Sequence, residues 1–212
     1  MTTTAHSIAK QLLEIEAVFL RPHDPFTWAS GIKSPIYCDN RLTLSSPAVR
    51  SAIEQALAEI VKEHYPDCEM LMGTSTAGIP HAAIVATLLE LPMGYVRASS
   101  KDHGRTNQIE GKCLSGTKVV VIEDLISTAG SCIDVVQVLR DHGCEVLGIA
   151  SIFTYGLKKG LEKLAEAKVK NVSASNYDAL IEVAVATDRI HHDDVQRLRA
   201  FRANPVDQSW MK

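Results

Sequence analysis

Two adjacent carboxylates, Glu123 and Asp124, directly follow a run of β-branched apolar residues at positions 119–122. Small residues come shortly after, from Ser127 to Ser131 (Ser-Thr-Ala-Gly-Ser). A loop of small residues that leads into a helix exposes backbone N–H groups and a partial positive charge, and both bind phosphate. The two carboxylates would repel a phosphate, but they suit sugar hydroxyl groups or the water around a metal ion. This stretch therefore predicts a site for a ribose phosphate.

A purely structural turn is the alternative for the same stretch. Strand, acid, small residues and helix follow one another in many α/β proteins, and a single acid there is more often structural than functional. Two acids followed by this run of small residues are rarer. From the chemistry alone, a phosphate site and a structural turn are about equally favoured.

A second loop of small residues joins a predicted strand at 69–72 to a predicted helix at 79–90. It has the sequence Gly-Thr-Ser-Thr-Ala-Gly-Ile-Pro over residues 73–80. Its backbone N–H groups suit a second anion. A tight turn between strand and helix is an equally favoured interpretation.

A polar segment, residues 99–111, follows a predicted strand at 93–98 that carries Arg97 near its end. The segment contains Lys101, His103 and Arg105, and it is too long for a simple connection, which is typical of a lid over an active site. The charges alone do not exclude a solvated surface loop. As a lid, these cations would close over an anionic leaving group.

The elements that position these loops alternate between strand and helix. Apolar patterns predict further strands at 145–153 and 172–174, and turn signals predict a hairpin at 26–40. Alternating strands and helices predict a parallel sheet buried on both faces, with ligands outside the carboxyl ends of its strands. Thr4 and Ser46 are the expected N-caps of the first two helices. The helices are predicted at 5–20, from 46–47 to 61, and at 133–139, 157–167, 177–186 and 195–203.

The cluster His191-His192-Asp193-Asp194 suggests a metal site by its composition. Neighbouring residues on a helix point in different directions, however, so four consecutive ligands do not converge on one ion. A solvated, capped helix start is the favoured interpretation.

The composition excludes several classes of protein. With 212 residues and 46% hydrophobic content, the chain suits one globular domain. A net charge of −3 gives no field that would recruit nucleic acid or an anionic membrane. The five cysteines lack C-x-x-C spacing, and no apolar segment suits a signal peptide or a membrane span. We therefore expect a cytoplasmic protein with reduced thiols.

Three motifs resemble those of one enzyme family. Residues 118–131 resemble the signature for 5-phosphoribosyl 1-diphosphate (PRPP) in type I phosphoribosyltransferases, in which a hydrophobic strand precedes two acids, two apolar residues and a small-residue loop. Residues 26–38 resemble the motif Phe-Thr-x-x-Ser-Gly-x-x-Ser-Pro-x-Tyr of orotate phosphoribosyltransferases. Residues 101–104 resemble the Lys-x-His-Gly motif of their catalytic loop.

The resemblance covers almost the whole chain. It implies the type I phosphoribosyltransferase fold, an α/β fold with a doubly wound, mainly parallel sheet. The chain would form a single domain over residues 1–212, with a small N-terminal hood drawn mainly from residues 1–45.

The same resemblance implies the transfer of ribose 5-phosphate from PRPP to orotate in pyrimidine biosynthesis. Mg²⁺ would be the cofactor, carried mainly by the diphosphate rather than by protein ligands. Catalysis is assigned to Lys101, His103, Glu123 and Asp124. Orotate binding is assigned to Ser127 and, through backbone groups, to Tyr37 and Cys38. The residues assigned to PRPP are Thr76, Ala77, Arg97, Lys101, His103, Glu123, Asp124, Leu125, Ile126, Ser127, Thr128, Ala129, Gly130 and Ser131.

The chain departs from the family pattern at two places. Ala98 stands where the family often has a second lysine, and residues 152–156 lack an arginine that binds orotate in some members. Each departure leaves one substrate contact without an assigned residue. The resemblance also implies a homodimer in which the 99–111 loop serves the neighbour's active site.

Two other functions share parts of the pattern. A nucleic-acid-binding regulator of the same fold would use PRPP as a signal, but it should carry a basic face, whereas this chain has 25 acidic residues against 22 Lys plus Arg. A purine phosphoribosyltransferase would share the PRPP signature but should lack the motif at 26–38.

Overall fold

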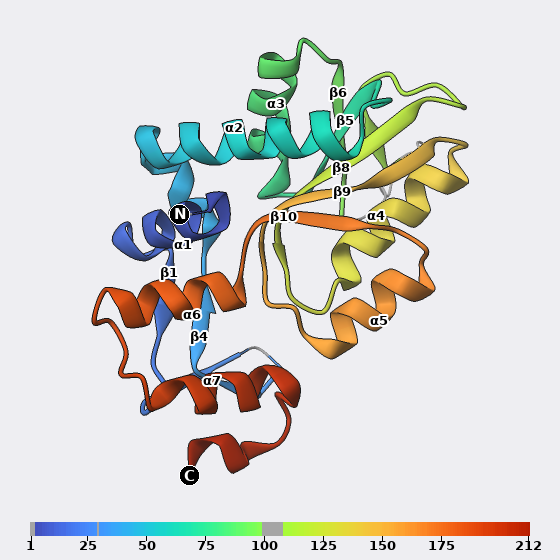
Figure 1. Ribbon diagram of the computed structural model, residues 1–212. Helices are drawn as coiled ribbons and strands as arrows, with labels where there is room; N and C mark the ends of the chain where they lie inside the picture. The colour runs from blue at the N-terminus through green and yellow to red at the C-terminus, as the bar shows by residue number, and fades with distance from the viewer. Residues whose placement is uncertain (1–2, 29, 99–107) are drawn as a thin grey trace.

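A six-stranded sheet forms the centre of the computed structural model, which describes residues 3–28, 30–98 and 108–212 (Figure 1). Its strand order is β10-β9-β8-β5-β6-β7, and every neighbouring pair is parallel except β6 and β7. The predicted doubly wound, mainly parallel sheet is confirmed. The strands are β5 (Met70–Thr74), β6 (Met93–Val96), β7 (Ile109–Glu110), β8 (Lys118–Ile126), β9 (Glu145–Thr154) and β10 (Asn171–Asn176).

The direction of winding reverses between β5 and β8. From β5 the chain moves outward to β6 and β7, and from β8 it moves the other way to β9 and β10. Open α/β sheets bind ligands outside the carboxyl ends of their strands at such a switch point. The two small-residue loops singled out in the sequence follow these two strands.

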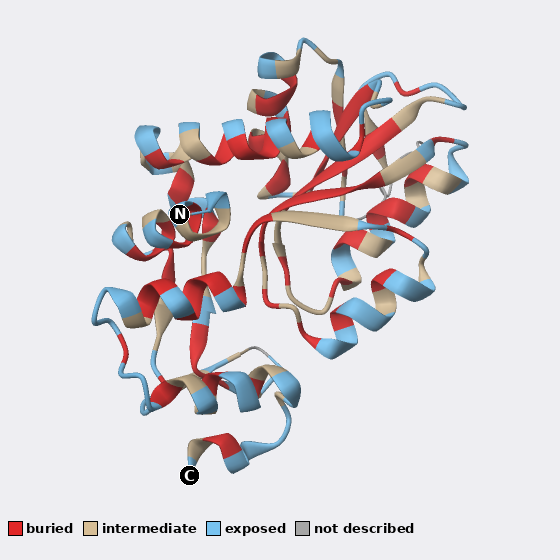
Figure 2. Ribbon diagram, viewed as in Figure 1, coloured by how far each residue is buried: buried red, intermediate tan, exposed pale blue. Residues whose placement is uncertain are grey.

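Strand β8 is buried on both faces, as its run of β-branched residues predicts. Val120 and Ile122 pack with the cluster that includes residues of α2 and α3, whereas Val119 and Val121 pack with α4 and α5. Alternate residues of a strand face opposite sides of the sheet, which explains this division. Figure 2 shows β8 and β9 buried between the two helical layers. The helices are α2 (Pro47–His64), α3 (Gly78–Leu89), α4 (Gly130–Asp141) and α5 (Lys158–Glu166).

A second group of elements, at the lower left of Figure 1, comes from both ends of the chain. The N-terminal part pairs β1 with β4 and β2 with β3, both antiparallel, so the hairpin predicted at 26–40 is present as β2 and β3. The elements are α1 (Thr4–Glu14), β1 (Val18–Leu20), β2 (Phe26–Thr27), β3 (Lys33–Ser34), β4 (Ile36–Cys38), the 3₁₀ helices η1 (Asn40–Ser45) and η2 (Gln208–Met211), α6 (Tyr177–Ala186) and α7 (Asp194–Ala203).

Aromatic side chains join the two ends of the chain. The ring of Trp28 stacks on Tyr155 at a centroid distance of 5.6 Å, and its edge meets Phe201 of α7 at 5.7 Å. Phe201 in turn contacts Trp210 of η2 at 5.5 Å. Because large aromatic rings bury much apolar surface, this row fixes the C-terminal elements beside the hairpin.

The first predicted helix is wrong in its length. Helix α1 ends at Glu14, Glu16 adopts a left-handed conformation (φ +57°), and Val18 begins a strand. The apolar spacing does fit a helix, but pairing with β4 overrides it. The N-cap is Thr3, whose hydroxyl accepts from the N–H of His6, and not Thr4.

The start of α7 is largely solvated as predicted, since His191, His192 and Asp193 are exposed, but the N-cap residue Asp193 makes no side-chain capping hydrogen bond. Asp194 is buried; its Oδ2 accepts from the N–H of His191 at 3.1 Å, and its Oδ1 lies 2.7 Å from Nε2 of His23. Within the described ranges, no group of three or more His, Cys, Asp or Glu residues is arranged to hold a metal ion.

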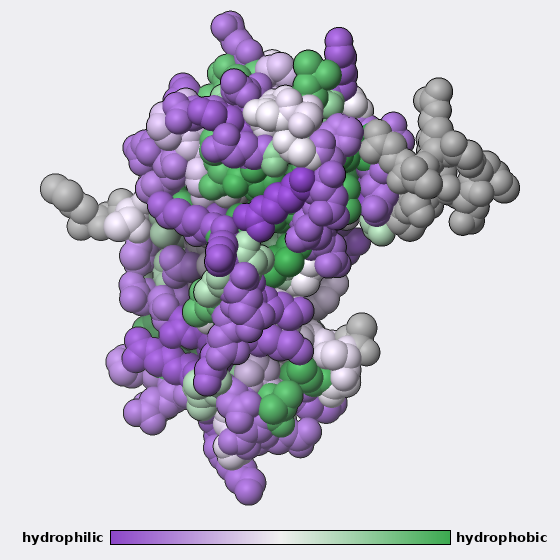
Figure 3. Space-filling model, turned by 90° about the vertical axis from the view of Figure 1, so that its right-hand side faces the viewer, coloured by the Kyte–Doolittle hydropathy of each residue, from purple (hydrophilic) through white to green (hydrophobic). Residues whose placement is uncertain are grey.

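The surface of the molecule is mostly polar on the face that Figure 3 shows, as expected for a sheet covered by amphipathic helices. The face on the right-hand side of Figure 1 is mostly hydrophilic, with scattered hydrophobic groups (Figure 3). Among the helices that the structure describes, none is long and apolar enough to cross a bilayer.

Candidate active site

The carboxyl ends of β5 and β8 hold their two loops against each other. At the end of β5, Thr74 Oγ1 lies 2.9 Å from Glu123 Oε1 and 3.3 Å from the carbonyl O of Ile122. Gly78, the first residue of α3, comes so close that a Cβ atom there would overlap Thr74 Oγ1 and the same carbonyl. Only glycine permits this approach. The first loop is therefore fixed to β8 by backbone packing and one hydrogen bond.

The two adjacent acids have different environments. Glu123 is 5% exposed, and its Oε1 accepts from Thr74 Oγ1 and from the N–H of Asp124, each at 2.9 Å. Burial, and next the neighbouring Asp124 carboxylate, raise the pKa of Glu123 to about 8. Asp124 is only half-buried. Adjacent residues of a strand point to opposite faces of the sheet, so the two carboxylates have different surroundings.

The second loop ends β8 and begins α4. Ala129 adopts a left-handed conformation (φ +59°) directly before Gly130, the first residue of the helix. The backbone N–H groups of Thr128, Ala129, Gly130 and Ser131 donate to no acceptor in the described part of the chain. Free N–H groups at a helix start are the donors that a phosphate group needs. Leu125 and Ile126, by contrast, are still within β8 and pair with β9.

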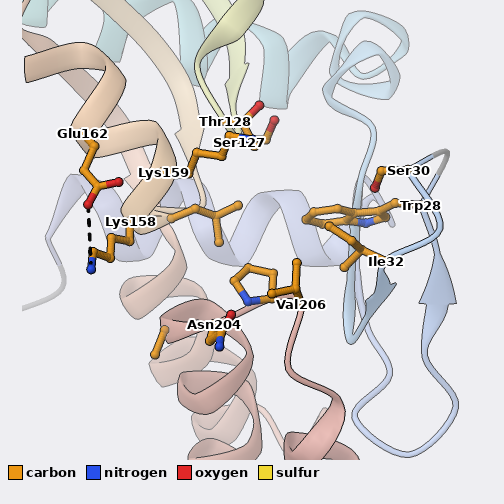
Figure 4. Close-up of a pocket in the computed structure, with 13 residues that line it drawn as sticks. Trp28, Ser30, Ile32, Ser127, Thr128, Lys158, Lys159, Glu162, Asn204 and Val206 are labelled. Atoms are coloured by element: carbon orange, nitrogen blue, oxygen red, sulfur yellow. Dashed lines mark ion pairs between the residues drawn. The ribbon is translucent and has the colours of Figure 1, made fainter. Parts of the chain in front are cut away.

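A cavity of about 710 Å³ opens beside this loop (Figure 4). The hairpin forms one wall, α5 a second, and the segment after α7 a third. Its volume suits a small-molecule ligand, since such sites usually measure some 300–1,000 Å³. The lining residues are Trp28, Ser30, Ile32, Ser127, Thr128, Leu157, Lys158, Lys159, Glu162, Ala203, Asn204, Pro205 and Val206.

Two residues of β4 were predicted to bind orotate; Cys38 lies near Asp124, and neither Cys38 nor Tyr37 lines this cavity. Tyr37 is 42% exposed, and Cys38 is half-buried, with its Sγ 3.3 Å from Asn40 Oδ1. Burial, followed by the nearby Asp124 and Asp39 charges, holds the pKa of the Cys38 thiol well above its usual range. Ser127, the third predicted orotate residue, does line the cavity.

Asn40 is a residue that sequence reasoning missed. It is buried, and its Nδ2 donates to the carbonyl O of Asp124 at 2.7 Å, which joins η1 to the end of β8. A buried amide bonded across the sheet edge positions the segment that carries the carboxylates. The polar Asp39-Asn40 pair after a short strand was the available signal, but its partner could not be read from the chain.

The predicted PRPP residues of the first loop lie beside the end of β6. Ser75 precedes Thr76 and Ala77, and its Oγ donates to the carbonyl O of Val96 at 2.6 Å. A cavity of about 120 Å³, lined among others by Ser75, Arg97 and Ser131, connects this region with the start of α4. Arg97 Nε lies 3.2 Å from Glu110 Oε1. Lys101 and His103 lie outside the described residues.

The segment 152–156, which lacks the arginine, packs against the hairpin. Tyr155, in the segment 152–156, is buried against Trp28. Among the described residues, no arginine lines the cavity. Its described lining includes Lys159, and also Lys158, whose ammonium lies 3.8 Å from the Glu162 carboxylate.

The comparisons with known proteins agree with this geometry. A model described as "Phosphoribosyl transferase domain" matches residues 43–194. A Bacillus cereus orotate phosphoribosyltransferase is 58% identical over 96% of this chain and 97% of its own length, and that of Bacillus subtilis is 56% identical over 97% and 95%. This chain belongs to the orotate phosphoribosyltransferase family. It is therefore a transferase.

Solved structures extend the likeness to three dimensions. The crystal structure of an orotate phosphoribosyltransferase from Aeropyrum pernix matches with a TM-score of 0.74 and 31% identity, over 82% of this chain and 96% of that one. A Leishmania donovani UMP synthase has the same fold, with a TM-score of 0.80 at 23% identity, and the match spans 95% of this chain and 42% of that one. The hairpin and the segment after α7 lie outside the matched domain model, yet they form two walls of the large cavity.

Proposed function

We propose that this orotate phosphoribosyltransferase joins orotate to the ribose 5-phosphate of PRPP and releases diphosphate, giving orotidine 5′-monophosphate for pyrimidine synthesis. The observation that carries the proposal is the arrangement at the β5–β8 switch point. A loop of free N–H groups, a half-buried carboxylate and a second small-residue loop meet there, beside a cavity of about 710 Å³.

The free N–H groups of residues 128–131 would hold the 5′-phosphate at the start of α4. Asp124 would accept hydrogen bonds from the ribose hydroxyls, because it is half-buried near the carboxyl end of β8. Glu123 belongs to the same acidic pair and would act indirectly, by positioning Thr74. Its carboxylate accepts a hydrogen bond from the Thr74 hydroxyl at 2.9 Å. Thr76 and Ala77 follow Thr74, and their backbone groups would contact the diphosphate.

Charge development explains the need for these groups. When the bond between ribose C1 and the diphosphate oxygen breaks, positive charge builds on the ribose and negative charge on the leaving diphosphate. The Asp124 carboxylate stabilises the first, and Arg97 with Lys101 and His103 stabilises the second. The oxygen donors of this site suit Mg²⁺, which would neutralise diphosphate charge when bound. Asp124 is the described carboxylate placed to orient the hydroxyls that such an ion contacts.

Orotate would enter between the hairpin and the phosphate loop. It is already an anion and needs little help from a base. Ser127 borders both the phosphate loop and the cavity, and Cys38, which follows Tyr37, is linked to Asp124 through Asn40. The net charge of −3 and the free thiols favour a cytoplasmic enzyme that binds neither nucleic acid nor membranes.

The direct test is the loss of orotate absorbance on addition of PRPP and Mg²⁺. We expect turnover only when all three are present, and none when a chelator removes the metal. Use of hypoxanthine, adenine or uracil in place of orotate would contradict the assignment.

A homodimer with shared sites is the proposed assembly, and its support is the family membership. The test mixes two inactive variants, Lys101→Ala with a defective loop and Asp124→Asn with a defective cradle. If the 99–111 loop acts in the neighbouring subunit, refolded mixtures should regain about a quarter of wild-type activity, because half the dimers are hybrids and each has one intact site. If the loop acts in its own subunit, the mixture stays inactive. A mixture of wild type with Lys101→Ala controls for refolding.

A further inference from the structure

Helix α5 packs directly on the phosphate loop through Gly160. A Cβ atom at Gly160 would lie 2.6 Å from the carbonyl O of Ser127, and 3.6 Å from the carbonyl carbon of Thr128. Side chains normally keep helices several ångströms further away, so the glycine brings the backbone of α5 against the loop. Residues that share this face of α5 must therefore lie beside the loop as well.

Two lysines of α5 lie near this contact, one directly before Gly160 and one three residues after it. Residues four apart on a helix point to the same side, which places Lys159 and Lys163 together. Lys163 Nζ lies 3.7 Å from the position that a Cβ of Gly130 would occupy, at the first residue of α4. Lys159 lines the cavity together with Ser127 and Thr128, and Figure 4 shows its side chain extending toward them.

These two lysines differ from their neighbour Lys158. The ammonium of Lys158 lies 3.8 Å from Glu162, and its side chain is 79% exposed; Figure 4 shows this pair pointing away from the loop. Lys159 and Lys163 have no carboxylate within 4.0 Å among the residues that the structure describes. Lys163 is also half-buried, which weakens its screening by water.

We propose that Lys159 and Lys163 are binding residues for the 5-phosphate of the substrate, so that α5 forms the second half of a site whose first half is the backbone of residues 128–131. This rests on the proposed function and adds to it. Backbone N–H groups bind a phosphate monoester by hydrogen bonds, and two ammonium groups supply the opposite charge that the loop itself lacks. The ligand class is a sugar carrying a terminal phosphate monoester.

The test measures the affinity of the whole enzyme for ribose 5-phosphate and, separately, for diphosphate. Lys159→Met and Lys163→Met should each weaken ribose 5-phosphate binding roughly tenfold, the effect of losing one charge-assisted hydrogen bond. The affinity for diphosphate should change less than twofold, because that anion binds at the first loop. High salt should narrow the gap between wild type and variants.

Lys158→Met is the matched control, since it removes the same charge from the same helix but from a side chain that faces Glu162. It should change ribose 5-phosphate affinity less than twofold, and Lys163→Arg should retain most of it. Gly160→Ala, which pushes α5 off the loop, should reproduce the loss without removing a charge.

Three outcomes would overturn the proposal: unchanged ribose 5-phosphate affinity in both methionine variants, equal losses for ribose 5-phosphate and diphosphate, or an equal loss in Lys158→Met. Thermal melting of each variant checks that the fold is intact. A wild-type protein that converts orotate while the methionine variants bind normally would refute this inference alone. A wild-type protein that neither binds ribose 5-phosphate nor converts orotate would refute the proposed function.

Discussion

The loop after β5 and the loop after β8 lie at the same edge of the sheet but are held in different ways. Residues 74–78 are wedged against β8, with Gly78 in backbone contact and Thr74 bonded to the buried Glu123. Residues 127–131 turn toward a large cavity and keep their N–H groups free. The first loop thus depends on close packing, and the second on groups kept available for a ligand.

The adjacent acids show the same contrast within two residues. Glu123 is bonded to the packed loop, and its raised pKa of about 8 favours the protonated form at neutral pH, whereas Asp124 is half-buried on the other, more open side. Substitutions on the open side should therefore affect turnover, and substitutions on the packed side should affect stability. The predictions below test this division.

Asp124→Asn should have the largest effect. Removing one electrostatic contact that acts in the transition state typically lowers kcat by about 10²–10³-fold. The thermal midpoint should stay near that of wild type, because a half-buried strand-end carboxylate supports little of the core. Steady-state kinetics with orotate and PRPP, together with a melting curve, measure both. A normal kcat would remove Asp124 from the mechanism.

Glu123→Gln should change how stability depends on pH. The raised pKa of about 8 means that the folded protein keeps this carboxyl protonated, whereas the unfolded chain ionises it near pH 4.5. Wild type should therefore lose stability as pH rises from about 4.5 to 8, and the glutamine variant should lose less. The difference between the two proteins in the free energy of unfolding should change by roughly 1–3 kcal/mol over that range, in favour of the glutamine variant at high pH.

Urea unfolding at pH 5, 6, 7 and 8 measures this gap, with the midpoint converted to a free energy of unfolding at each pH. A gap that stays constant over that range would show that Glu123 ionises normally in the folded protein.

Gly78→Ala and Gly130→Ala should show that the first loop is packed more tightly than the second. At Gly78 the new methyl group meets backbone and Thr74, so we expect a loss of about 1–3 kcal/mol in the free energy of unfolding. At Gly130 the methyl group has 3.7 Å to its neighbour Lys163 Nζ, and stability should change by less than about 0.5 kcal/mol. Equal losses in urea unfolding would mean that the second loop is packed as tightly as the first.

Thr74→Val should have a modest effect. It removes the hydroxyl that donates a hydrogen bond to Glu123 at 2.9 Å, while keeping the shape of the side chain. The expected cost is about 1 kcal/mol, the usual net value of one hydrogen bond. The double variant Thr74→Val, Glu123→Gln tests whether the two side chains interact. If the stability losses of the single variants add up to that of the double variant, the hydrogen bond between Thr74 and Glu123 does not contribute to stability.

Local sequence was enough to predict much of this molecule. The apolar run at 119–122 predicted a strand buried on both faces, and the structure has that strand. Helix α6 spans 177–186 as predicted. The small residues at 127–131 predicted a loop with free backbone donors, and residues 128–131 provide them. These features depend on backbone preferences and on apolar spacing, which act over a few residues. The matched motifs were likewise contiguous, and the family they indicate is the one that the comparisons show.

Contacts between distant segments were decided only by the tertiary structure. Pairing of Val18–Leu20 with Ile36–Cys38 ended the first helix early, and the row from Trp28 to Trp210 placed the C-terminal elements on the cavity. The bond between Thr74 and Glu123, the bond from Asn40 to Asp124, and the approach of α5 at Gly160 also join residues far apart in the chain. Such contacts depend on which elements pack together, and one residue's type does not specify a partner 30 or more positions away.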